Sequence, residues 1–180
     1  MATTSLPTSR QLDWSGNALL VTDIVATGNV YANSQTLNAA APTNVTAATL
    51  AVSASSHAGK ITTLNKADGL AVTMPAASGT GNSYKFFIGT TSTSVGYSFV
   101  PTGASAIFAG VHVAGDSTDG TAHIWATAAD TNKIILGGTS NATGGIKGDF
   151  VELIDVATDL WFVRITGDAG GTEASPFSHV

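Results

Sequence analysis

The side chains of this sequence that could take part in chemistry gather around one short acidic stretch. His112 and His123 flank the segment 116–120, which contains Asp116 and Asp119. If that segment is a hairpin turn, the two histidines face each other, and imidazole together with carboxylate can bind zinc. Two histidines on paired strands are, however, more often plain cross-strand neighbours. We therefore expect no metal and no other cofactor.

The same stretch, Asp-Ser-Thr-Asp-Gly, also has the oxygen-rich character of part of a calcium loop. An EF-hand needs a closing Glu at position 12 of its loop, and Thr127 stands at that position when Asp116 is position 1. A calcium site that other loops complete remains an open alternative.

Two further motifs are similar to enzyme motifs, but the sequence around each does not fit that function. Gly115-Asp116-Ser117 is similar to the nucleophile block of lipase-like hydrolases, but it lies mid-chain, precedes Thr118 and has no Asp-x-x-His partner downstream. Asp, Ser and Gly are typical turn residues, so a turn is the better interpretation. The glycine-rich segment 79–84 precedes a strand pattern and lacks the third glycine of a dinucleotide-binding loop. With only two Glu residues, no acid–base pair can be nominated, and we expect no enzyme.

The composition points to association with other proteins. Ala, Thr, Ser and Gly fill 91 of 180 positions, and only 11% of residues are charged, against about 25% in ordinary soluble domains. Seven Lys and Arg against twelve Asp and Glu cannot form a basic patch, so we expect no nucleic acid partner. No apolar run approaches the ~18 residues of a membrane span, and there is no cysteine. So few charges predict a surface prone to association.

Short apolar runs between turn residues predict the elements that position these side chains. Spacing of ~8–12 residues between turns is typical of an all-β sandwich or barrel. We expect an antiparallel β-sandwich or barrel, with apolar odd-numbered positions along 107–113, a hairpin turn at Asp68-Gly69 and a hairpin around Ala157–Asp159. The expected strands are 49–53, 60–64, 70–74, 84–88, 98–100, 106–113, 122–127, 133–136, 149–156 and 160–166.

The aromatic side chains concentrate after Tyr84 and should supply most of the core. Phe86-Phe87 and Trp161-Phe162 place aromatic rings on both faces of one strand. A strand that is apolar on both faces is buried on both. We expect a second sheet to cover one face, and an arm or another subunit to cover the other.

Residues 1–45 differ from the β-domain predicted for residues 46–180. Apolar residues there occur in short clumps between Gly and Asn, without the spacing of a core. We expect an extended N-terminal arm that becomes ordered on a partner. Its partner-binding candidates are Trp14, Leu19, Leu20, Val21, Ile24, Val25 and Tyr31.

Three motifs in the β-domain carry a resemblance. They are the strand pair ending in Ala-Val-Thr-Met-Pro-Ala (71–76), the Gly-rich turn and aromatic strand of 79–87, and the Gly-Asp-Phe-Val-Glu-Leu strand (148–153) that leads to Trp161. Together they resemble small β-rich virion proteins of tailed bacteriophages, namely capsid decoration (cement) or head-fibre proteins. The resemblance covers residues 58–167.

The resemblance implies a virion protein on the outer capsid surface, assembled in the bacterial cytoplasm. It implies a homo-oligomer, with a trimer favoured, that bridges subunits of the major capsid protein and stabilises the head. The alternative is a head-fibre or tail-associated module that binds a receptor or glycan. In that case the loops 116–120 and 137–145 would contact sugars, although they contain no aromatic residue to stack on them.

Overall fold

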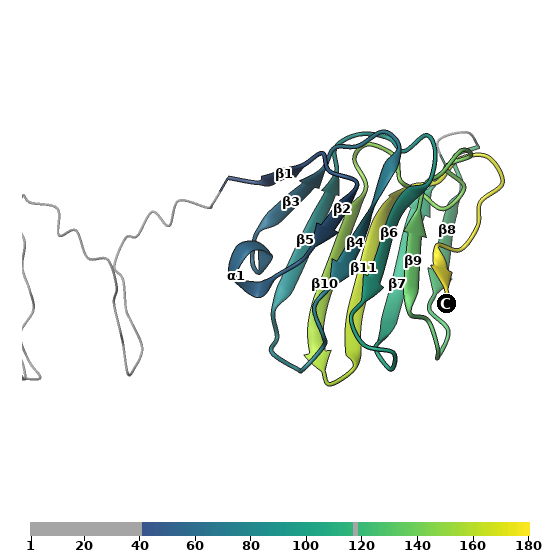
Figure 1. Cartoon of the computed structure of the whole chain (residues 1–180). Coiled ribbons are helices and arrows are strands. Elements are labelled where there is room, and N and C mark those ends of the chain that lie inside the picture. The colour runs from purple at the N-terminus through teal and green to yellow at the C-terminus, as the bar shows by residue number, and fades with distance from the viewer. Residues whose placement is uncertain (1–40, 117–118) are drawn as a thin grey trace, which may run out of the picture. The chain divides into compact units, whose positions relative to one another are not determined.

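The computed structural model describes residues 41–116 and 119–180, and these residues form two mixed β-sheets with almost no helix. Figure 1 shows the sheets as two layers, with one short helix, α1 (Ala54–His57), beside the first strands. The protein is therefore all-β, as the strand patterns predict.

One sheet has seven strands in the order β1-β3-β5-β10-β11-β7-β8. Its members are β1 (Thr43–Val45), β3 (Ile61–Leu64), β5 (Ser83–Ile88), β7 (Ile107–Gly115), β8 (Ala122–Ala126), β10 (Phe150–Ala157) and β11 (Leu160–Asp168).

The other sheet has five strands in the order β12-β9-β6-β4-β2. Its members are β2 (Thr49–Ala51), β4 (Gly69–Met74), β6 (Gly96–Pro101), β9 (Lys133–Leu136) and β12 (Phe177–Ser178).

All ten strands expected from the sequence are present, with ends that differ by up to two residues. The short elements β1, β12 and α1 were not expected, because two to four residues carry no periodic pattern. β1 lies inside the segment predicted as an arm, and it pairs with β3 in register from Thr43↔Thr62 to Val45↔Leu64. Within residues 41–116 and 119–180, pairing in this sheet thus begins at residue 43.

The expectation of antiparallel sheets is wrong for five strand pairs. β1–β3, β3–β5, β2–β4, β4–β6 and β7–β11 are parallel. From β1 to β6 the chain alternates between the two sheets. A strand that returns to its own sheet after crossing through the other runs in the same direction as before, so successive neighbours are parallel. Among the described strands, β7–β8 and β10–β11 are the consecutive pairs that form antiparallel hairpins.

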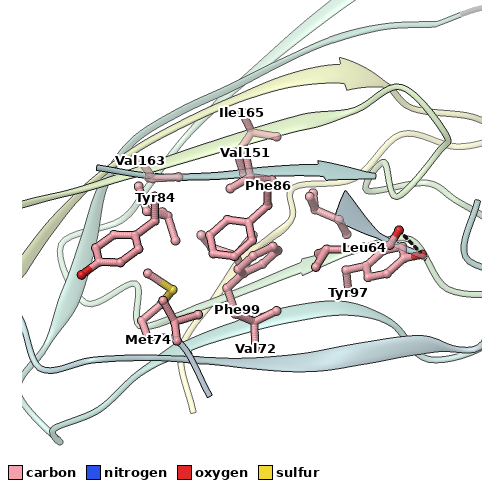
Figure 2. Packing of buried hydrophobic residues seen from close by; sticks show 14 of the residues in the cluster. Leu64, Val72, Met74, Tyr84, Phe86, Tyr97, Phe99, Val151, Val163 and Ile165 are labelled. Carbon is pink, nitrogen blue, oxygen red and sulfur yellow. Dashed lines mark hydrogen bonds between the residues drawn. The ribbon is translucent and has the colours of Figure 1, made fainter. Parts of the chain in front are cut away.

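Aromatic side chains from both sheets fill one core, as predicted. Phe86 from the seven-stranded sheet meets Phe99 from the five-stranded sheet edge to face, with ring centroids 5.1 Å apart, and Figure 2 shows this contact at the centre of the core. Tyr84 packs on Trp161 in the same manner at 5.7 Å. The Tyr97 hydroxyl lies 2.6 Å from the Thr90 carbonyl oxygen, so its polar end is satisfied inside the core.

The predicted Asp68-Gly69 hairpin is a turn, but it does not join paired strands. Gly69 N–H donates to the Lys66 carbonyl, while β3 and β4 belong to different sheets. Gly69 has φ +88, and a Cβ there would lie 2.0 Å from the carbonyl oxygen of Gly96. The glycine therefore allows both the turn and the close approach of β4 to β6.

Replacing Gly69 by Ala should lower the free energy of unfolding by at least ~2 kcal/mol, because a positive φ and a backbone clash add together. The matched control is Gly59→Ala, which has a similar φ of +71 but no atom within 4 Å of its Cβ. That change should cost only about 1 kcal/mol. Urea unfolding of both variants checks this, and equal losses would contradict the role of close packing at Gly69.

Candidate functional site

The outer face of the seven-stranded sheet, turned away from the core, carries many apolar side chains. Two rows of side chains cross it in register. One is Phe87–Phe150–Thr166–Val113–Ile124, and the other contains Ile154, Phe162 and Ala109. Ile124 is 69% exposed and Phe162 37% exposed. We call Phe87, Val113, Ile124, Phe150, Ile154 and Phe162 the outer apolar face.

A single charged row separates these two apolar rows. Lys85, Glu152 and Arg164 are register partners on β5, β10 and β11. The Arg164 guanidinium Nη2 lies 2.7 Å from Glu152 Oε2. An Arg guanidinium can bind a carboxylate through two parallel hydrogen bonds, so such a pair has a preferred orientation as well as charge. The face thus combines apolar area with one fixed polar pair.

This face follows from aromatic residues on both sides of single strands. Phe86 and Trp161 point into the core and are fully buried, whereas their neighbours Phe87 and Phe162 belong to the outer apolar face. The five-stranded sheet covers the inner side, as predicted. That an arm or subunit covers the outer side stays a prediction.

The alternation predicted along residues 107–113 is present in β7. The apolar odd-numbered positions face outward, with Val113 39% exposed, while Phe108, His112 and Ala114 are buried. Phe108 fixes this register, because a large ring gains most from the core. His112 is carried inward on the same face of the strand.

The two histidines do not face each other, so that expectation is wrong. His112 is paired with Trp125, and His123 with Ala114. The Trp125 ring instead contacts both, stacked on His112 at 5.3 Å and on His123 at 5.5 Å. The two histidines lie one cross-strand pair apart because the hairpin turn sets the register of β7 and β8.

The segment between these histidines is a hairpin turn, as predicted. Asp116 N–H donates to the Thr121 carbonyl, Gly120 N–H donates to the Asp116 carbonyl, and Thr121 N–H donates to Asp119 Oδ1. Ser117, the nucleophile position of the hydrolase-like motif, lies outside the described residues.

His112 is fully buried, and neither of its ring nitrogens has a hydrogen-bond partner among the described residues. Burial lowers the pKa of His112 from 6.5 to about 4, because the charged ring would lose its hydration. Gly144, from the segment between β9 and β10, lies against this ring and against the Asp149 carboxylate. His112 is therefore neutral at pH 7.

The Asp149 side chain is buried next to Gly144 and stands at the end of the segment 144–149. Burial raises its pKa to about 6, while backbone N–H groups of Asp168, Ile146 and Gly145 donate to the carboxylate and oppose that rise. These contacts join the segment to the end of β11. Asp149 thus has a structural role.

The glycine-rich segment 79–84 does bind an anion, but the anion is a side chain of the same protein. The backbone N–H groups of Ser78, Gly79 and Thr80 all donate to the Asp155 carboxylate, at 2.9, 2.7 and 3.1 Å. Burial alone would raise the pKa of Asp155, but these bonds and that of the Thr80 hydroxyl lower it overall. The donors that a phosphate would need are therefore already engaged.

The candidates Trp14, Leu19, Leu20, Val21, Ile24, Val25 and Tyr31 lie outside the described residues. Of the helices within residues 41–116 and 119–180, none has the length and apolar character needed to cross a bilayer.

Comparison of the chain with family models, curated proteins and solved structures finds no match. In the sequence, the paired aromatic residues indicated the outer apolar face.

Replacing His112 by Phe should raise the free energy of unfolding by roughly 1–2 kcal/mol at pH 7, since it removes two buried polar atoms without partners. Below pH 6.5 the unfolded chain binds a proton on His112, and the folded chain does not until about pH 4. This group therefore costs stability as the pH falls through that window.

The advantage of His112→Phe over the unchanged protein should grow between pH 6.5 and pH 4. Chemical unfolding of both proteins across this range measures it. A variant that is less stable at every pH, with a constant difference, would contradict the assignment.

Proposed function

We propose that this chain is a non-enzymatic decoration protein of a tailed-phage capsid, which sits on the outer surface and bridges subunits of the major capsid protein. The observation that carries the proposal is the outer apolar face of the seven-stranded sheet, on a chain with 11% charged residues. The motifs between residues 58 and 167 that resemble virion proteins support the same assignment.

In this proposal the two sheets act as a β-sandwich, and its outer apolar face packs against other copies of the chain. Ile124 and Phe162 expose apolar area whose removal from water is worth ~25 cal/mol per Å². The Glu152–Arg164 pair restricts the angle at which a second copy can dock. A trimer is the state that the resemblance favours.

Residues 1–42, which precede β1, supply the contact with the major capsid protein. Their apolar clumps, from Trp14 to Tyr31, suit an extended segment that adds to the edges of a partner's sheets. Several copies in one oligomer then hold the capsid by multivalent contact, so that each contact can be weak. Sparse charge allows these contacts to desolvate at low cost.

Replacing Ile124 by Asp should weaken self-association at least tenfold, which corresponds to about 1.4 kcal/mol, because the carboxylate would be buried at the interface. The matched control is Val95→Asp, since Val95 is also 69% exposed but does not belong to the outer apolar face. Light scattering across a concentration series measures the mass of each protein.

The unchanged chain and the control should form the same oligomer, while Ile124→Asp dissociates at higher concentrations. Circular dichroism confirms that all three proteins are folded. A monomeric unchanged chain, or equal association of both variants, would contradict the role of this face.

A further inference from the structure

Three metal-ligating side chains from separate parts of the chain meet beside β8. They are Asp116 at the end of β7, His123 on β8, and Glu173 on the segment between β11 and β12. One donor atom from each lies within 4.8 Å of the others. His123 Nε2 and Glu173 Oε2 are 3.6 Å apart. Glu173 is fifty residues from His123 in sequence, so only the fold places them together.

The carboxylates of this cluster are poorly exposed to water. Asp116 is 5% exposed, and the Glu173 side chain is 15% exposed. The second oxygen of Glu173, Oε1, is buried and has no hydrogen-bond partner among the described residues. A buried carboxylate oxygen without a partner is costly, and such an atom commonly marks a bound ion or water.

The imidazole of His123 is held in place by its neighbours. Its ring stacks on Trp125 with an interplanar angle of 14°. Its Nε2 lies 2.9 Å from Thr121 Oγ1, and that hydroxyl donates its own proton to Asp119 Oδ1 at 2.6 Å. Nε2 therefore donates to Thr121 Oγ1, and a cation bound at Nε2 would displace both that proton and this hydrogen bond. A ligand ring that is fixed beforehand loses little entropy on binding.

We infer that Asp116, His123 and Glu173 form a binding site for a divalent transition-metal ion of the zinc class. One imidazole and two carboxylates suit Zn²⁺, which in open sites takes three protein ligands and a water. Ca²⁺ prefers six to eight oxygen ligands, and an imidazole nitrogen is a poor match. Two ligands on a tetrahedral zinc lie ~3.3–3.4 Å apart, close to the 3.6 Å between His123 and Glu173.

The ion would act as a structural clip. It would join the β7–β8 turn and the edge strand β8 to the segment 169–176, which leads to β12 on the other sheet. Binding to the folded chain alone stabilises it by linkage. This function is independent of capsid attachment, and the purified full-length chain suffices to test it.

Calorimetric titration of Zn²⁺ into the chelator-treated full-length chain should show one site per chain. Glu173→Gln and His123→Gln should each weaken Zn²⁺ binding at least tenfold. The matched control is His179→Gln, whose imidazole contacts the Asp130 carbonyl instead. Co²⁺ should give the visible absorption of a four-coordinate site in the unchanged chain and lose intensity in Glu173→Gln.

A second readout keeps the inference testable if His123→Gln folds poorly. Zn²⁺ should raise the melting temperature and slow proteolysis within residues 169–176 in the unchanged chain and in His179→Gln, but not in Glu173→Gln. The inference is overturned if Zn²⁺ does not bind, if Glu173→Gln binds as tightly as the control, or if Ca²⁺ binds more tightly than Zn²⁺.

Discussion

Side chains along a strand alternate between its two faces, and in the seven-stranded sheet both sets are largely apolar. The inner set is satisfied by one core, in which Phe86 meets Phe99 of the other sheet at 5.1 Å. Among the described residues no second layer covers the outer set, and Phe162 and Ile124 are exposed. Because a one-residue shift would exchange the two faces, the core contact fixes which apolar side chains are presented outward.

The unequal width of the two sheets explains where polar chemistry collects. Five strands cannot cover seven, and at β7 and β8 the inner face is met by loop segments instead, with Gly144 against His112 and Glu173 beside His123. There the inward-facing side chains include His112, His123 and Trp125, and the carboxylates of Asp116 and Glu173 approach from the adjacent turn and loop. The outer apolar face and the proposed metal site thus lie on opposite faces of β8.

The sequence predicted where strands lie better than which strands are partners. Ten strands and the aromatic core follow from local patterns, and so does the 157–159 hairpin, where Asp159 adopts φ +58. Asp68-Gly69 encodes a turn, but whether the next strand stays in the sheet depends on non-local contacts such as Gly69 with Gly96. For the same reason, no local sequence pattern indicated the parallel strand pairs, the inward orientation of His112 or the approach of Glu173 to His123. The paired aromatic residues at 86–87 and 161–162 did indicate the outer apolar face.

The copy number of this chain in purified virions, relative to the major capsid protein, tests the proposed role most directly. Quantitative mass spectrometry of intact particles gives that ratio. A decoration protein that bridges capsid subunits should be present in numbers comparable to the major capsid protein. A handful of copies per particle, as for a tail or fibre component, or none at all, would contradict the proposed function.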